Sequence, residues 1–100
     1  FRMKIEFANN SIARILTDKA HKMGLPFAVI NAARRTLIKL EAASNERDLF
    51  AIGGVDYKIR KGGNNEIRQV RVNDQYRIFF TIAGEGSNLV ATITFIGDPH

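Results

Sequence analysis

The alternation of hydrophobic and polar residues divides the chain into a helical first half and a strand-rich second half. Residues 3–7 alternate between apolar and charged side chains, which predicts a short, half-buried strand. A helix is predicted over about residues 11–23, with side chains at 9–11 able to cap its start and Gly24 able to end it in a left-handed conformation. A second helix is predicted over residues 26–43, beginning at a proline that suits a first turn. Its buried stripe is predicted to consist of Ile30, Ala33, Leu37 and Leu40.

After residue 45 the pattern changes to the period of two that is typical of strands. Strands are predicted over residues 55–60 and 67–72, and the slipped alternation of the second indicates a β-bulge. Residues 75–83 and 89–96 are apolar on both faces, as expected of central strands. Turn-forming residues separate the predicted strands at positions 62–65, 73–74 and 84–88.

The order of these elements predicts an α+β fold. A strand and two packed helices are followed by about four strands, so we expect an antiparallel sheet with the helices on one face. A chain of 100 residues has room for one core, which predicts a single domain over residues 1–100.

Composition narrows the class of protein. Hydrophobic residues make up 45% and charged residues 25%, which excludes a disordered or fibrous chain. No charge-free stretch reaches the roughly 20 residues of a membrane-spanning helix, so no membrane partner is expected. Cysteine is absent, which excludes disulfides and cysteine nucleophiles and favours a cytoplasmic location.

The net charge suggests a polyanionic partner. Fifteen lysines and arginines against ten acidic residues give a formal charge of +5. A small basic domain suits nucleic acid, the ribosome or an acidic protein. The alternative is that the basic side chains simply face water.

Few kinds of catalysis fit these residue types. Two histidines and no cysteine provide too few ligands for a clustered metal site, and no glycine-rich loop has the spacing of a nucleotide-binding motif, so neither a metal nor a cofactor is expected. Cleavage of RNA by attack of its own 2′-hydroxyl on the adjacent phosphate remains. That reaction needs a base, an acid and cations that stabilise the developing charge.

Side chains of these types gather in the strand-rich half. Asp98 and His100 follow the last predicted strand. Arg77 stands in a strand that otherwise looks buried, where it would either bind phosphate or pair with Asp98 or Asp74. Tyr76 is a candidate for stacking on a base, although strand tyrosines also serve as packing residues. The candidate cations are Lys58, Arg60, Lys61, Arg68, Arg71 and Arg77.

Several segments occur in an informative order. They are TDKAHKMGLP before NAARRTLIKLEAAS, ERDL leading into YKIRKG, then NEIRQVRVNDQYRIFF, and finally ITFIGDPH. Together they cover nearly the whole chain and resemble the RelE/ParE superfamily of type II toxins, most closely its host-inhibition-of-growth (HigB) branch. The resemblance implies a small sheet with two helices packed on it.

The resemblance also implies a function. Such toxins are ribosome-dependent endoribonucleases that cut mRNA in the ribosomal A site, inhibit translation and are held inactive by a cognate antitoxin protein. It gives Lys61 the role of the catalytic, phosphate-binding lysine and Arg77 that of stabilising the transition state. Asp98 and His100 become the base and the acid, in either order. Arg68 and Arg71 match positions at which the family often has further cations.

One position departs from the pattern of that branch. Pro99 stands where the branch has a tyrosine, which removes an aromatic ring that could stack on the substrate base. Proline also restricts Asp98 to extended conformations. Tyr76 is the candidate to replace the stacking.

Two other functions remain open. The first is a toxin on the same fold that poisons DNA gyrase, a branch that lacks the catalytic histidine. The second is a non-catalytic module that binds RNA or the ribosome. A dispensable His100 would support either one, and loss of binding on charge reversal at Lys61 or Arg71 would support the module.

Overall fold

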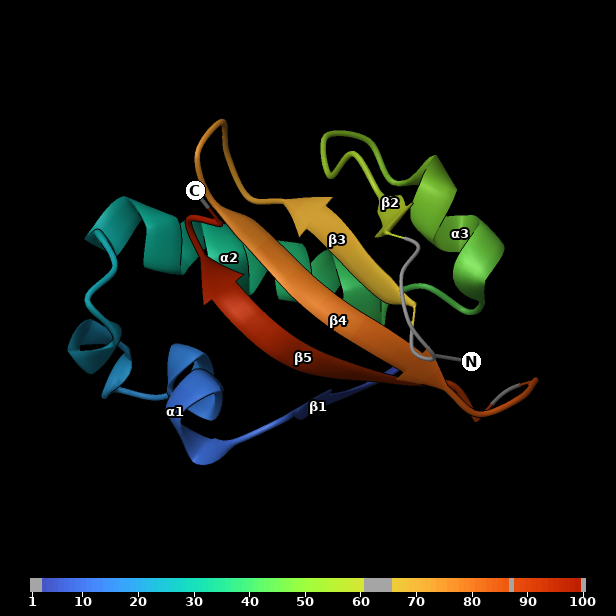
Figure 1. The fold of residues 1–100 in the computed structure, drawn as a ribbon, viewed down its shortest axis with the longest axis horizontal. Coiled ribbons are helices and arrows are strands. Elements are labelled where there is room, and N and C mark those ends of the chain that lie inside the picture. Colours follow the sequence, from blue (N-terminus) through green and yellow to red (C-terminus); the bar gives the residue numbers. More distant parts are fainter. Residues whose placement is uncertain (1–2, 61–65, 87, 100) are drawn as a thin grey trace.

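The computed structural model describes residues 3–60, 66–86 and 88–99. Figure 1 shows a twisted sheet with a long helix behind it. In the described residues the sheet has five strands: β1 (Lys4–Phe7), β2 (Lys58–Arg60), β3 (Ile67–Arg71), β4 (Arg77–Ala83) and β5 (Val90–Gly97). The helical elements are α1 (Asn10–Ala13), η1 (Arg14–Leu16), η2 (Ala20–Met23), α2 (Phe27–Glu41) and α3 (Glu46–Ala51), where η marks a 3₁₀ turn.

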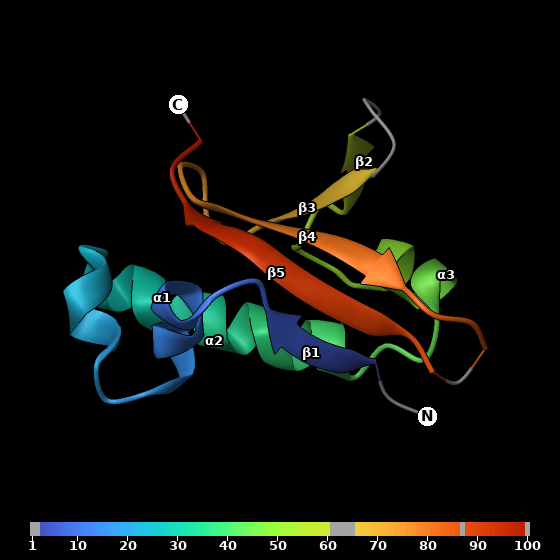
Figure 2. The ribbon, with the colours of Figure 1, turned by 60° about the horizontal axis from the view of Figure 1, so that its bottom comes forward.

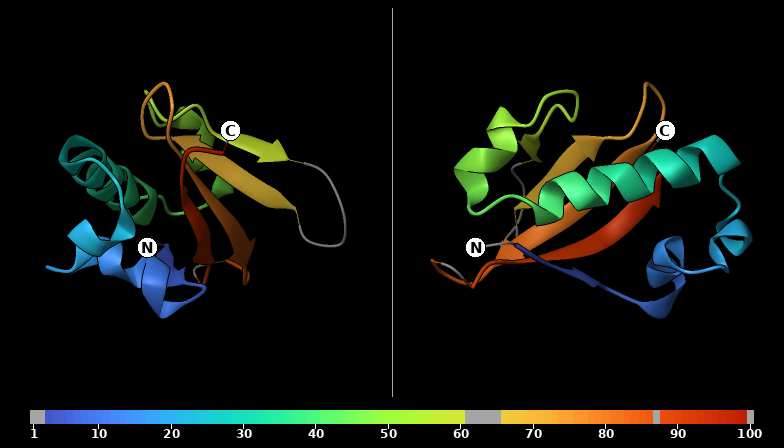
Figure 3. Two further views of the ribbon diagram at one scale, coloured as in Figure 1. Left: turned by 60° about the vertical axis from the view of Figure 1, so that its left-hand side comes forward. Right: turned by 180° about the vertical axis from the view of Figure 1, so that it is seen from behind.

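The strand order is β1-β5-β4-β3-β2, so the two strands predicted to be central lie in the middle of the sheet. The predicted α+β class is confirmed, but the sheet is mixed because β1 pairs with β5 in parallel. The other neighbouring strands are antiparallel. The right-hand view of Figure 3, from behind, shows α2 and α3 on the same side of the sheet.

The core lies between α2 and the sheet. The predicted stripe of α2 is confirmed, because its four residues are at most 5% exposed. They pack with side chains from the near face of the sheet, among them Val70, Ile78, Phe80, Ala91 and Ile93. No helix of the described ranges is long and apolar enough to cross a membrane.

The predicted continuous helix over residues 11–23 is wrong. The helical segment of α1 and η1 ends at Leu16, and η2 begins only at Ala20. Asn9 caps α1 by accepting a hydrogen bond from Ile12 N at 3.0 Å. The Thr17 hydroxyl then donates to Arg14 O at 2.9 Å and accepts from Lys19 N at 3.1 Å. Such local bonds compete with the helical pattern and close a turn in its place.

The predicted end of this region at Gly24 is confirmed. Gly24 has a φ of 74°, the left-handed conformation that a glycine adopts without a steric penalty. The second predicted helix is α2, which is shorter by a few residues than residues 26–43.

The predicted bulge on residues 67–72 is also misplaced. β3 pairs without interruption with both of its neighbours. The register shift lies between Phe79 and Phe80, where β4 meets β5. The first strand of the second half begins at Lys58 instead of residue 55, because Asp56 takes a left-handed φ of 48°.

Candidate functional site

The face of the sheet opposite α2, called here the open face, carries a basic hollow. Figure 2 shows β2 and the segment after β5 both rising on this side. Between them is a hollow of about 490 Å³. Its described lining consists of Lys58, Ile59, Arg60, Gln69, Arg77 and Pro99. The structure thus brings together three predicted cations from β2 and β4.

Arg77 is held in place by the turn between β3 and β4. Its Nη1 donates to the carbonyl oxygens of Asn73 at 2.5 Å and Tyr76 at 3.0 Å. These acceptors are neutral, so they fix the guanidinium without cancelling its charge. In the described part of the chain no carboxylate forms an ion pair with Arg77. Asp74 pairs with Arg71 instead.

Asp98 lies beside this same turn. Its Oδ2 accepts a hydrogen bond from Gln75 Nε2 at 2.8 Å, which ties the end of β5 to the β3–β4 loop. Figure 1 shows this end of the chain next to the loop. Lys61 and His100 lie outside the described residues. Their described chain neighbours, Arg60 and Pro99, both line the basic hollow.

Arg68 lies on the other face of the sheet. Its side chain is only 13% exposed. The Nε atom donates to Glu46 Oε1 and to the Tyr57 hydroxyl, both at 3.1 Å. The structure therefore does not bring Arg68 together with the basic hollow, and the contact joins β3 to α3.

Tyr57 completes this contact. Its hydroxyl donates to Glu46 Oε1 at 2.8 Å, and its ring stacks on Phe80 with centroids 6.0 Å apart. Burial raises the pKa of Tyr57, and the Glu46 carboxylate raises it further. Burial alone would lower the pKa of Arg68, but the bonds to Glu46 and Tyr57 raise it overall. The three side chains therefore form a stable structural tie.

Of the remaining predicted residues, Lys58 lines the hollow, whereas its described lining does not include Arg71 or Tyr76. Arg71 stands directly opposite Arg77 in the β3–β4 register. Lys58 Nζ lies 3.4 Å from Asp56 Oδ2. Both side chains are more than half exposed, so this ion pair is weak. Tyr76 contributes its backbone to the turn, since its carbonyl accepts from Val72 N at 3.0 Å.

Two aromatic side chains of the open face were missed by the sequence analysis. Phe79 and Phe95 are paired across β4 and β5, with ring centroids 5.3 Å apart. The Arg60 guanidinium carbon lies 5.3 Å from the Phe79 centroid. The sequence does show apolar residues on both faces of these two strands. That pattern predicts burial on both faces, whereas Phe95 remains 36% exposed.

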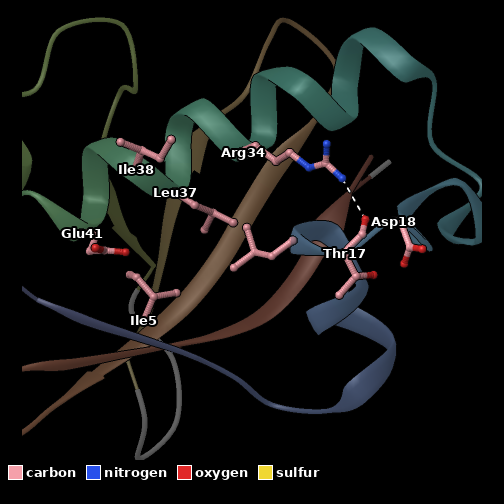
Figure 4. A pocket seen from close by; sticks show the side chains of 8 residues that line it. Ile5, Thr17, Asp18, Arg34, Leu37, Ile38 and Glu41 are labelled. Carbon is pink, nitrogen blue, oxygen red and sulfur yellow. Dashed lines mark hydrogen bonds between the residues drawn. The ribbon is translucent and has the colours of Figure 1, made fainter.

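A second hollow of about 490 Å³ lies on the helical side and is mostly apolar. Figure 4 shows Arg34 crossing its rim to donate to the Thr17 carbonyl. Its lining is Ile5, Leu16, Thr17, Asp18, Arg34, Leu37, Ile38 and Glu41, which includes none of the predicted site residues. Within the described ranges, no three side chains of the histidine, cysteine, aspartate or glutamate types gather as a metal ion requires.

Comparison with known proteins identifies a matching protein family. Residues 5–100 match a family model described as the RelE-like toxin of the type II toxin–antitoxin system HigB. The chain is 32% identical over 99 residues to Toxin HigB-1 of Vibrio cholerae serotype O1 (strain ATCC 39315 / El Tor Inaba N16961), an alignment that covers 98% of each chain. No solved structure matches the chain.

Proposed function

Because the chain belongs to the HigB-like family of RelE-like toxins of type II toxin–antitoxin systems, we propose that it is a ribosome-dependent endoribonuclease. It cuts mRNA in the ribosomal A site and thereby inhibits translation. The family match to HigB favours this activity over gyrase poisoning.

The observation that carries the proposal is the basic hollow on the open face. Lys58, Arg60 and Arg77 line it together, although they come from two strands separated by β3. Clustered cations in a concave site concentrate an RNA backbone there and neutralise its phosphates. Arg77 is also preorganised by two carbonyl groups, so its charge needs no rearrangement when the phosphate arrives.

The proposed reaction is a transesterification. A base takes the proton of the 2′-hydroxyl, and the 2′-oxygen attacks the adjacent phosphorus. The bond to the 5′-oxygen breaks, an acid protonates that oxygen, and a 2′,3′-cyclic phosphate remains. Asp98 and His100 are the proposed base and acid, in either order, while Lys61 and Arg77 stabilise the charge on the phosphate oxygens.

The remaining candidates would bind RNA away from the bond that breaks. Lys58 and Arg60 line the hollow and can hold neighbouring phosphates. Arg71 and Tyr76 flank Arg77 at the end of the sheet and are proposed as further contacts. Arg68 supports the sheet through Glu46 and adds its charge only from the far side.

The expected protein partner is the cognate antitoxin. A net charge of +5 favours an acidic antitoxin, because complementary charge speeds association. It would cover either the open face around Arg77 or the helical side that carries the apolar hollow. Competition between a short RNA and the antitoxin distinguishes these places, since RNA competes only at the open face.

The test is expression of the wild type beside Arg77→Ala and His100→Ala, with growth measured and the 5′ ends of cellular mRNA mapped. We expect growth arrest with in-frame cuts from the wild type. Loss of one preorganised cation should lower cleavage by roughly 10²- to 10³-fold in Arg77→Ala. Arg35→Ala, an exposed arginine on α2, is the matched control and should keep both effects. Arrest without cuts that survives His100→Ala would reject the nuclease.

A further inference from the structure

Phe95 presents a large ring to solvent on the open face. The residue is 36% exposed, whereas Ala91 and Ile93 of the same strand belong to the core and are fully buried. The ring is not isolated, because Phe79 lies against it at 5.3 Å with the ring planes 40° apart. We call Phe79 and Phe95 the aromatic pair.

The two rings are not equally accessible. Arg60 lies over the Phe79 ring, in the geometry of a cation–π contact. Phe79 is also half-buried, with Phe95 at its other side. Phe95 is therefore the ring that a flat ligand can reach, and Phe79 supports it from beside.

Gly97 lets the Phe95 ring lie toward the basic hollow. A β-carbon at position 97 would come within 2.9 Å of Phe95 Cζ, closer than such atoms approach. Gly97 is also the residue paired directly with Arg77 across β4 and β5. The tip of the ring thus lies over the immediate neighbour of Arg77, since paired strands are only about 4.8 Å apart.

We propose that the aromatic pair is a stacking platform for one base of single-stranded RNA, with Phe95 in contact with the base. Arg60 and Arg77 then hold the phosphates on either side of that nucleotide. The inference rests on the proposed function, because it names a base subsite of the same RNA-binding face. Exposed aromatic rings beside a basic groove are a general solution for binding single strands.

The charges favour RNA over a protein partner at this place. The aromatic pair is bordered by Arg60 on one side and by the pair of Arg77 and Gly97 on the other. A protein interface of ordinary composition loses charged residues at its centre, whereas here cations lie beside the exposed ring. A base with its flanking phosphates matches both features.

The experiment measures binding without cleavage. Purified full-length protein is titrated with short single-stranded RNAs that carry 2′-O-methyl groups, so that no 2′-hydroxyl can attack. Each RNA is compared with versions that lack one base at each position in turn. For the wild type, removal of one particular base should weaken binding by about fivefold or more, the lower end of base–aromatic stacking.

The variants assign that discrimination to the ring. Phe95→Leu should bind the complete RNA and the RNA without that base equally well. Gly97→Ala, which displaces the ring, should reduce the discrimination too. Phe95→Tyr keeps a ring and should retain it. Phe27→Leu is the matched control, because Phe27 is 76% exposed at the start of α2 and should not change it.

Three outcomes would overturn the platform. The first is a Phe95→Leu variant that still discriminates as the wild type does. The second is a folded Phe95→Tyr that has lost discrimination. The third is a wild type that binds complete and base-deleted RNAs alike, with Phe95→Leu affecting only self-association or antitoxin binding.

Thermal unfolding of each variant shows whether it is folded. Discrimination without mRNA cuts would reject the nuclease alone, and cuts without discrimination would reject the platform alone.

Discussion

Tyr57 shows how a single contact makes stability depend on pH. Its pKa is raised above the usual value of 10.0, so the folded protein holds the phenol neutral where the unfolded chain releases the proton. A raised folded pKa gives stability that is complete below about pH 10 and is lost as the pH rises further. The contribution of Tyr57 therefore disappears on the alkaline side.

We expect Tyr57→Phe to be less stable than the wild type by about 1 kcal/mol at pH 8, because the hydrogen bond to Glu46 is lost. Near pH 11 the wild type should lose about 1.4 kcal/mol relative to this variant, which removes its advantage. Denaturant unfolding at the two pH values measures the difference, with Tyr76→Phe as the control. A difference that stays constant between the two pH values would contradict this account.

Residue by residue, the sequence could name the cations but could not separate them. Arg77 is distinguished by its buried-looking strand, but nothing in the sequence shows that Arg68 and Arg77 lie on opposite faces of the sheet. The side of the sheet on which each lies depends on register, which a shift of one residue reverses. The register places Arg68 opposite the buried Phe80 and Arg77 opposite Gly97. Only the paired strands reveal that difference.

At the scale of elements, Arg34 fastens the broken N-terminal helix to α2. Its Nε donates to Ile15 O at 2.6 Å and its Nη2 to Thr17 O at 2.9 Å. Those carbonyls are two of the groups left over where the helix stops. The guanidinium thus satisfies them and fixes the position of η1 against α2.

We predict that Arg34→Lys destabilises the protein by about 1–3 kcal/mol, because an ammonium group cannot reproduce the two-pronged contact. Arg35→Lys is the neighbouring control, and its exposed side chain should change stability by less than about 0.5 kcal/mol. Denaturant midpoints of both variants provide the comparison. Equal midpoints would mean that Arg34 does not fasten the two elements.

Sequence patterns predicted the elements that pack regularly. The stripe of α2 and the central position of β4 and β5 follow directly from spacing and hydrophobicity. The break after Leu16 did not, because it combines the local bonds of Thr17 with carbonyls that are satisfied by Arg34, a residue far along the chain. The short helix α3 was missed, although Asn45 caps it by accepting from Asp48 N at 3.0 Å. Its capping pattern was readable, but six residues are too few for a clear period.

At the scale of the whole molecule, the candidate site forms where distant segments meet. The end of β5 lies beside the β3–β4 loop, and β2 borders the same hollow across β3. The sequence named the charged residues, the order of the elements along the chain and the two central strands. It could not show that two phenylalanines share the open face with them, since an apolar strand reads the same whether one face or both are covered.

The charge distribution predicts which face of the molecule carries the salt dependence of RNA binding. Each phosphate neutralised in single-stranded RNA contributes about −0.7 to the slope of log affinity against log salt, so three cations of the hollow give a slope of about −2. Lys58→Ala should make the slope shallower by about 0.7. Lys39→Ala should leave it unchanged, because Lys39 is exposed on α2 on the opposite side. The measurement is binding of a 2′-O-methyl RNA across a salt series. A slope that responds to Lys39 and not to Lys58 would move RNA binding to the helical side, and the antitoxin would then be expected on the open face.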